Sequence, residues 1–177
     1  FSYIASSAAD KGRAVCIIVH RKELLLQASA SLAALGIDHG LISPFFRPKP
    51  RALVQVASVD TLLLRLKKQP NAFKFGLLIF DEAHHVLDGN KWGRAFEQLG
   101  RPPMLGVTAT PVRTDGKGLG QHAGGVFKRM VLGPSVVELI ARGMLINPVV
   151  YASPEIPKVD DLKINKEGDY NLKDLAA

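Results

Sequence analysis

Short runs of β-prone apolar residues alternate with helical patterns along this chain of 177 residues. The run at 14–19 is continuous and apolar, as expected for a strand buried on both faces. Further strands are predicted at 53–57, 75–80, 104–108 and 148–151, and helices at 23–35, 58–66, 92–99 and 135–141. Such alternation predicts an α/β domain with a mainly parallel sheet that is covered by helices.

Polar residues gather where these predicted strands end. In parallel sheets the ligands bind at the carboxyl ends of the strands. The clusters are His20-Arg21-Lys22, Ser58-Val59-Asp60, Asp81-Glu82-Ala83-His84 and Thr108-Ala109-Thr110. The sequence therefore predicts a functional site at one edge of the sheet.

The most specific of these clusters follows the apolar run at 77–80, which delivers the adjacent carboxylates of Asp81 and Glu82 to the end of a strand. One carboxylate can hold the water shell of a magnesium ion, which prefers one or two carboxylates together with phosphate oxygens. The next can orient and deprotonate an attacking water, and phosphoryl transfer depends mostly on such positioning. A bare Asp-Glu pair would be read as a solvated acidic turn, but the full sequence through His84 is much more specific.

Four motifs in this chain resemble those of superfamily 2 helicases. Asp81-Glu82-Ala83-His84 resembles motif II, the Walker B motif of the DEAH-type members, and residues 107–111 resemble motif III. Residues 19–27 resemble motif Ia and residues 56–62 resemble motif Ib. The segment 135–148 is similar to the end of the first domain in helicases like the restriction Res subunit. Gly168-Asp169-Tyr170-Asn171 is similar to the interdomain region of the same helicases. The resemblance implies a three-layer RecA-like P-loop NTPase domain that uses ATP and Mg²⁺.

The resemblance also implies roles for individual residues. Asp81 would coordinate Mg²⁺ through water, Glu82 would be the general base, and His84 would couple the nucleotide site to a second domain. Thr108 and Thr110 would link hydrolysis to movement on the nucleic acid. The residues implied to face the nucleic-acid backbone are Arg21, Lys22, Ser58 and Arg113. Basic side chains and helix starts suit phosphate contact, although surface solvation is the alternative for the three basic residues.

The phosphate-binding loop of these enzymes has no counterpart here. It needs Gly-x-x-x-x-Gly-Lys-Ser/Thr, and Lys117 is followed by Gly118. We read residues 1–9 as the rest of the helix that this loop opens, so the loop and its strand are expected just before Phe1. That strand normally lies inside the sheet, and deleting it would leave unpaired backbone groups and a slot in the core. We therefore expect either that the whole molecule includes this strand or that another segment fills the gap.

The domain prediction is a partial, N-terminally truncated RecA-like ATP-binding domain at 1–152, with a linker at 153–177 towards a second motor domain. The leading function is a fragment of an ATP-dependent DNA helicase or translocase. The alternative is a non-catalytic nucleic-acid-binding remnant, which the missing loop favours. A P-loop protein of another class is a third reading, which the motif at 108–110 disfavours.

Composition agrees with these readings without deciding between them. The formal net charge of +7 and the pI of about 9.7 fit a polyanionic partner, although many basic proteins bind no nucleic acid. The single cysteine, Cys16, lies in an apolar run and is expected to be a buried thiol in the reducing cytoplasm. No apolar run approaches the roughly 20 residues that span a bilayer. His85 is expected to pack or hydrogen-bond rather than to bind a metal ion.

Overall fold

The computed structural model describes residues 1–113, 116–149 and 151. The chain divides into two compact units, Phe1–Phe127 and Lys128–Ala177, and each is described by itself. The predicted linker at 153–177 lies outside the described residues, so the predicted boundary at 152 stays a prediction. In the part of the chain that the structure describes, no helix is long and apolar enough to cross a membrane.

The first unit is built on a five-stranded sheet with the order β2-β3-β1-β4-β5. All neighbouring strands run parallel, which confirms the predicted α/β class. The strands are β1 (Val15–Val19), β2 (His39–Ile42), β3 (Val54–Ser58), β4 (Leu77–Asp81) and β5 (Met104–Val107). The central strand β1 is buried along its whole length because its residues are apolar on both faces, as the sequence predicts.

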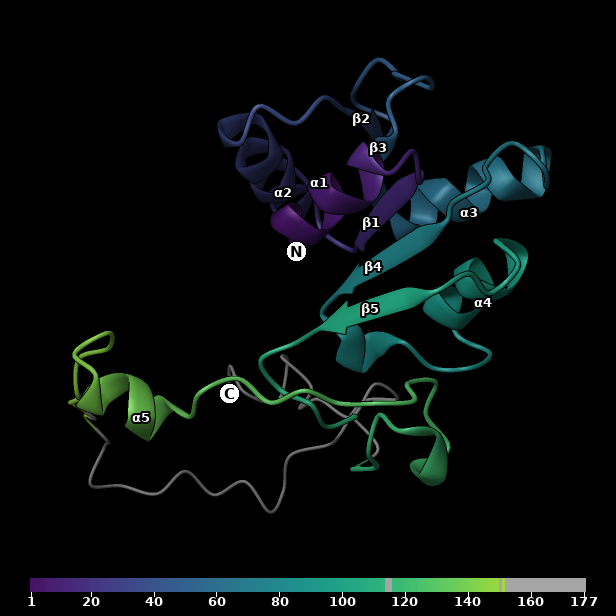
Figure 1. The fold of residues 1–177 in the computed structure, drawn as a ribbon. Helices are drawn as coiled ribbons and strands as arrows, with labels where there is room; N and C mark the ends of the chain where they lie inside the picture. Colours follow the sequence, from purple (N-terminus) through teal and green to yellow (C-terminus); the bar gives the residue numbers. More distant parts are fainter. Residues whose placement is uncertain (114–115, 150, 152–177) are drawn as a thin grey trace, which may run out of the picture. The chain divides into compact units, whose positions relative to one another are not determined.

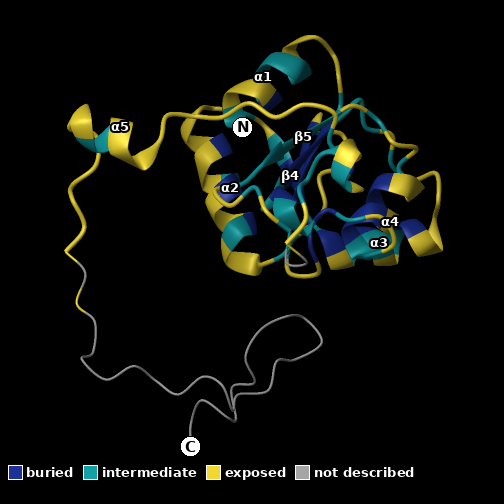
Figure 2. Cartoon of the chain, turned by 90° about the horizontal axis from the view of Figure 1, so that it is seen from below, coloured by how far each residue is buried: buried dark blue, intermediate teal, exposed yellow. Residues whose placement is uncertain are grey.

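Helices cover both faces of this sheet (Figure 1). On one face α1 (Ser2–Asp10) and α2 (Lys22–Ala34) pack on Val15, Ile17 and Val19 of β1. On the other face α3 (Val59–Lys68) and α4 (Lys91–Gln98) pack on Cys16 and Ile18. Figure 2 shows the buried residues concentrated between these layers. Three layers are therefore present, and the predicted helices at 23–35, 58–66 and 92–99 are confirmed within two residues at each end.

The sheet has no internal slot, contrary to the expectation from the missing loop. Each strand from β2 to β5 pairs directly with its neighbour, so the interior is continuous in the described residues. Within these residues β5 is an edge strand that pairs with β4 alone, and its four residues are only partly buried. A further strand would therefore extend the sheet at β5 rather than fill a gap within it.

Strand β2 was not predicted from the sequence. It is short, and its first residues are His39 and Gly40. Strand β2 is held by its pairing with β3. This pairing needs glycine at position 40, because a Cβ there would lie 2.4 Å from Oε1 of the buried Gln55. Nε2 of Gln55 donates to the carbonyl oxygens of Lys49 and Ala52, at 2.8 and 2.9 Å. The loop at 44–51 that follows β2 is exposed along most of its length.

The second unit contains α5 (Val136–Ala141), which confirms the predicted helix. Ser135 and Glu138 form a capping box, and Gly143 beyond the helix has a φ of 68°. The predicted strand at 148–151 is wrong at 148, 149 and 151, which are not in a strand, and residue 150 lies outside the described residues. Val149 is 74% exposed, so this apolar run does not form a buried strand.

Candidate functional site

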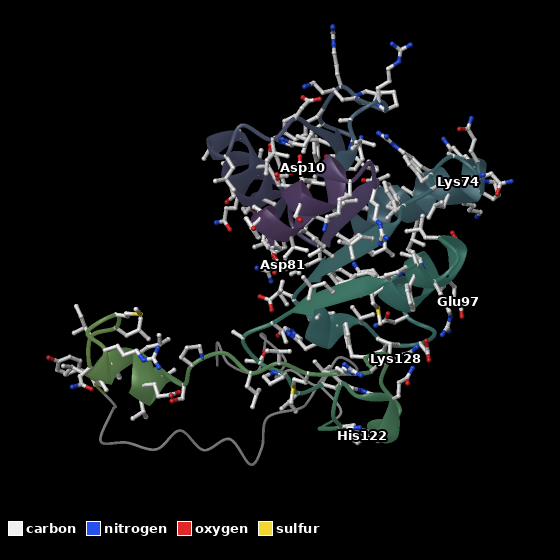
Figure 3. The ribbon with its side chains drawn as sticks, in the orientation of Figure 1. Asp10, Lys74, Asp81, Glu97, His122 and Lys128 are labelled. Atoms are coloured by element: carbon white, nitrogen blue, oxygen red, sulfur yellow. The ribbon has the colours of Figure 1, made fainter. Side chains whose placement is uncertain are left out.

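The carboxyl ends of the parallel strands bring the predicted polar clusters to one edge of the sheet. Val19 pairs with Ser58, so the motif after β1 begins beside the end of β3. Asp81 pairs with Val107, so the acidic motif, Asp81-Glu82-Ala83-His84, begins beside Thr108-Ala109-Thr110, the motif that follows β5. Asp81 is the last residue of β4 (Figure 3). The sheet register therefore brings the predicted polar clusters to the same edge of the sheet.

The acidic pair lies in an unusual turn of the backbone. Glu82 has a φ of 54°, and within the described residues only Arg101 shares a positive φ among non-glycine residues. The backbone N–H of Glu82 donates to Oδ1 of Asp81 at 3.1 Å. A left-handed conformation at a non-glycine residue is costly and is often found at functional sites. The Glu82 side chain that follows this turn is 38% exposed.

His84 connects the acidic motif to the motif after β5. Its Nδ1 lies 2.9 Å from Oγ1 of Thr108 and 3.3 Å from Oγ1 of Thr110. The same nitrogen lies 3.3 Å from Oε2 of Glu82. The His84 side chain is only 17% exposed, whereas the Glu82 side chain is 38% exposed and the contact with Thr110 lies at the surface. Four of the predicted site residues are thus in one contact network.

A proton on Nδ1 of His84 satisfies this network best. The carboxylate of Glu82 can only accept a hydrogen bond, which favours a donor at Nδ1. Oγ1 of Thr108 accepts from the N–H of Thr110 at 3.1 Å and donates to the Thr110 carbonyl at 3.2 Å. The Thr108 hydroxyl proton is then used, so its oxygen accepts from His84. We assign this tautomer from the network of partners.

His85 packs in an aromatic cluster beneath this network, which confirms the structural role expected for it. Its ring stacks on Trp92 with centroids 6.0 Å apart and meets His20 edge-on at 5.3 Å. Burial lowers the pKa of His85, and the neighbouring His84 lowers it further. Burial also lowers the pKa of His20, with a smaller contribution from Arg21. The cluster joins the ends of β1 and β4, a contact that sequence spacing did not reveal.

Asn90 was also missed by the sequence reasoning. Its side-chain oxygen accepts hydrogen bonds from the N–H groups of Trp92 and Gly93, at 2.9 and 3.1 Å, and so caps α4. Its amide nitrogen donates to the His85 carbonyl at 2.7 Å. The preference of Asn for helix starts was the available signal. Asn90 therefore ties the acidic motif to the helix that packs beneath it.

Close packing holds β4 and β5 together behind the site. A Cβ on Gly106 would lie 2.6 Å from Cβ of Ala83 and 2.5 Å from ring atoms of Phe127. Real Cβ atoms essentially never show contacts below 3.0 Å, so this position admits only glycine without a shift of its neighbours. Gly106 therefore allows the motif after β4 to sit directly against β5.

The residues expected to face nucleic acid lie in two different environments. Arg21 and Lys22 are exposed, and they precede and begin α2. Ser58 is half-buried at the start of α3, but its hydroxyl makes no capping hydrogen bond. Arg113 instead donates from Nη1 to the carbonyls of Ala123 and Gly124, at 3.3 and 3.0 Å. Its guanidinium thus holds the loop that follows β5.

The side chains present fit a hard divalent cation rather than a tightly ligated metal. In the described residues there is no group of three or more His, Cys, Asp or Glu side chains placed to hold an ion. Asp81 and Glu82 nevertheless offer adjacent carboxylate oxygens at a half-exposed strand end. Mg²⁺ keeps several waters and uses one or two carboxylates, so this donor set suits it.

Comparison with known proteins assigns the chain to a family. The family described as "Type III restriction enzyme, res subunit" matches residues 2–113, more than half of the chain. The chain is 31% identical over 174 residues to a "51.5 kDa protein" of a Lactococcus phage, covering 98% of this chain and 34% of the relative. It is 38% identical over 115 residues to the "Putative mitochondrial ATP-dependent helicase irc3" of Schizosaccharomyces pombe, covering 58% of this chain and 18% of the relative.

A shorter match is the "DNA 3'-5' translocase XPB2" of Sulfurisphaera tokodaii, 41% identical over 64 residues that cover 36% of this chain and 14% of the relative. The chain thus spans about a third or less of the length of these relatives. The matched range contains strands β1 to β5, the acidic motif and Thr108-Ala109-Thr110, the motif that follows β5. The chain belongs to the type III restriction enzyme res subunit family, and its parallel sheet with the flanking helices is a RecA-like domain of the superfamily 2 helicases.

Proposed function

We propose that this chain is part of the first motor domain of an ATP-dependent DNA helicase or translocase, which couples ATP hydrolysis to movement on nucleic acid. The observation that carries the proposal is the shared position of His84 Nδ1, which lies within 3.3 Å of oxygens from Glu82, Thr108 and Thr110. Such a contact lets a change at the acidic motif reach the strand end beside it. The helicase and translocase names of the relatives support the same activity, and the translocase supports DNA as the partner.

In this proposal Asp81 and Glu82 have separate tasks. Asp81 would hold Mg²⁺ through water, and the ion would supply charge neutralisation for the phosphates of ATP. The Glu82 carboxylate orients the attacking water and accepts its proton. The 38% exposure of the Glu82 side chain leaves it open to a water, while its contact with His84 fixes its direction. His84, Thr108 and Thr110 transmit the state of this site to the nucleic acid and to a second motor domain.

We further propose that residues 1–152 belong to the motor domain and residues 153–177 connect it to that second domain. The relatives are several times longer than this chain, which leaves room for both a phosphate-binding loop and a second domain. The open side of β5 is where the strand before such a loop would pair. The alternative is a non-catalytic nucleic-acid-binding remnant, which the absence of Gly-x-x-x-x-Gly-Lys-Ser/Thr from these residues favours.

The nucleic-acid backbone would run along the edge formed by Arg21, Lys22 and Ser58. Arg113 completes this set in the proposal through its place in the loop after β5. The net charge of +7 supports a polyanionic partner. Binding should be independent of sequence, and log K should fall with log salt at a slope of about −0.9 per neutralised phosphate on duplex DNA.

Two experiments test the proposal. The coding sequence upstream of Phe1 should encode a strand followed by a loop that ends in Gly-Lys-Ser or Gly-Lys-Thr. The full-length protein should then hydrolyse ATP faster when DNA is added. If the upstream sequence lacks the loop and the protein does not hydrolyse ATP with DNA or RNA present, the enzyme proposal is wrong. The alternative, a non-catalytic nucleic-acid-binding protein, would then be favoured.

A further inference from the structure

The loop after β2 presents an aromatic ring to solvent at the same edge of the sheet. Phe45 is 67% exposed, whereas the adjacent Phe46 packs against the core cluster beneath α2. Ile42, the last residue of β2, pairs with Ala57, one residue before Ser58. Phe45 follows Ile42 by three residues. The ring therefore extends the row of strand ends that already carries Arg21, Lys22 and Ser58.

Local contacts hold Phe45 in this exposed position. The buried Ser43 accepts a hydrogen bond at Oγ from the N–H of Phe45, at 3.4 Å. Nη2 of Arg65, on α3, donates to the Ser43 carbonyl at 3.4 Å. Phe46 anchors the other side of the turn in the core. An exposed ring on an anchored turn loses little conformational freedom when it binds a ligand.

A cation lies over this ring. Nζ of Lys22, in the first turn of α2, lies 4.7 Å from the ring centroid of Phe45. In the described residues the other cation–aromatic contact is Arg101 on Phe96, whose ring belongs to the buried core. Lys22, at the start of α2, and Phe45, in the loop after β2, therefore bring an exposed ammonium and an exposed aromatic ring together at one point.

We propose that Phe45 is a stacking platform for an unpaired base of single-stranded nucleic acid, with Lys22 contacting the adjoining phosphate. Inside a duplex both faces of a base are covered by its stacked neighbours, whereas a single strand can turn the face of a base towards an aromatic side chain. A site that bound only the phosphate of the backbone would need cationic side chains but no aromatic ring. Proteins that bind single strands combine aromatic platforms with a cationic path for the backbone, as Phe45 and Lys22 do here. This inference rests on the proposed nucleic-acid function and adds to it the unpaired base as ligand.

The test uses the 177-residue chain and two labelled oligonucleotides of equal length, oligothymidine and the same backbone without bases, with binding followed by fluorescence anisotropy. Phe45→Leu should weaken oligothymidine binding about tenfold and leave binding of the abasic strand unchanged, because stacking contributes about that factor per base. Phe45→Trp should restore the wild-type affinity. Lys22→Gln should weaken binding of both strands and lower the salt slope by about 0.7.

The matched control is Tyr3→Leu, which removes an aromatic side chain that is 81% exposed on α1. It should leave both affinities unchanged. The inference is overturned if Phe45→Leu binds oligothymidine as tightly as the wild type does, or if it loses the same factor on both strands. A wild-type chain that binds neither strand would instead contradict the proposed nucleic-acid function itself. Because Phe45 is exposed, its variants should keep the wild-type circular dichroism spectrum and thermal midpoint.

Discussion

Nδ1 of His84 lies 2.9 Å from Oγ1 of Thr108, so a side chain after β4 is hydrogen-bonded to the residue that directly follows β5. The two strands are neighbours, with Asp81 paired to Val107. The contact is local in space although 24 residues separate its partners in sequence. Since Glu82 contacts the same nitrogen, His84 links Glu82 to the motif after β5 through side chains alone.

Replacing Thr108 should break this connection with little change in shape. Thr108→Val removes the hydroxyl and should lower the free energy of unfolding by about 1 kcal/mol, the net contribution of one hydrogen bond. In the full-length protein it should reduce the stimulation of ATP turnover by DNA while nucleotide affinity is kept. Thr108→Ser retains the hydroxyl and should behave as the wild type. Equal DNA stimulation in Thr108→Val and Thr108→Ser would show that the hydroxyl carries no coupling.

Asn90 should contribute to stability through two separate contacts. Asn90→Ala loses the cap of α4 and the hydrogen bond to His85, and should cost about 1–2 kcal/mol in urea unfolding. Asn90→Asp keeps an acceptor for the helix N–H groups but cannot donate to His85, so it should cost less. Ser58→Ala is the control at a helix start without a side-chain cap and should cost below about 0.5 kcal/mol. A Ser58→Ala loss as large as that of Asn90→Ala would contradict the assignment.

Gly106 should not accept even one methyl group. Gly106→Ala places its Cβ within 2.6 Å of Ala83 and Phe127, and overpacking of this kind costs about 1–3 kcal/mol. Gly76→Ala is the matched control, because a Cβ there meets no atom closer than 3.6 Å. Thermal unfolding of both variants measures the difference. The double variant Gly106→Ala with Ala83→Gly should recover part of the loss, and no recovery would place the clash elsewhere.

The histidine cluster should make the first unit less stable in mild acid. The pKa values of His20 and His85 are lowered from about 6.5, mainly by burial, so the unfolded state binds more protons than the folded state below that pH. Stability is therefore complete above about pH 6.5 and is lost as the pH falls towards the folded-state pKa values. Urea unfolding at about pH 7.5 and pH 5.5 tests this.

Replacing one of these partly buried histidines should reduce this dependence on pH. His85→Gln removes a titrating ring from the cluster and should make the loss of stability on acidification smaller than in the wild type. The exposed His122→Gln variant controls for the loss of one histidine at the surface. A free energy of unfolding that is the same at both pH values in the wild type would contradict the linkage.

The central strands were predictable because their residues are apolar on both faces. The runs that became β1 and β4 are short, continuous and rich in apolar residues, which is typical of a strand buried on both faces. The acidic pair and its position at a strand end followed from the same pattern. Burial of Cys16 was likewise predicted and is confirmed, and burial raises the pKa of its thiol.

Other features depend on contacts that a linear pattern does not contain. Strand β2 is held by pairing with β3 and by the space at Gly40, so its short polar sequence gave no strand signal. Val149 sits in an apolar run but is exposed, because apolar residues form a strand only where a neighbour pairs with them. The histidine cluster brings His20 and His85 together from two strand ends, which required the sheet order.

The most direct test of the account is ATP turnover by Glu82→Gln in the full-length protein, measured beside nucleotide affinity. The amide keeps the size of the side chain but cannot accept a proton, so turnover should fall by about 10²–10⁴ while ATP still binds. Asp81→Asn should instead weaken the Mg²⁺-dependent part of binding, because it removes the charge nearest the ion. If Glu82→Gln turns over ATP at a near-normal rate, Glu82 is not the base, and the acidic motif of this chain is only structural.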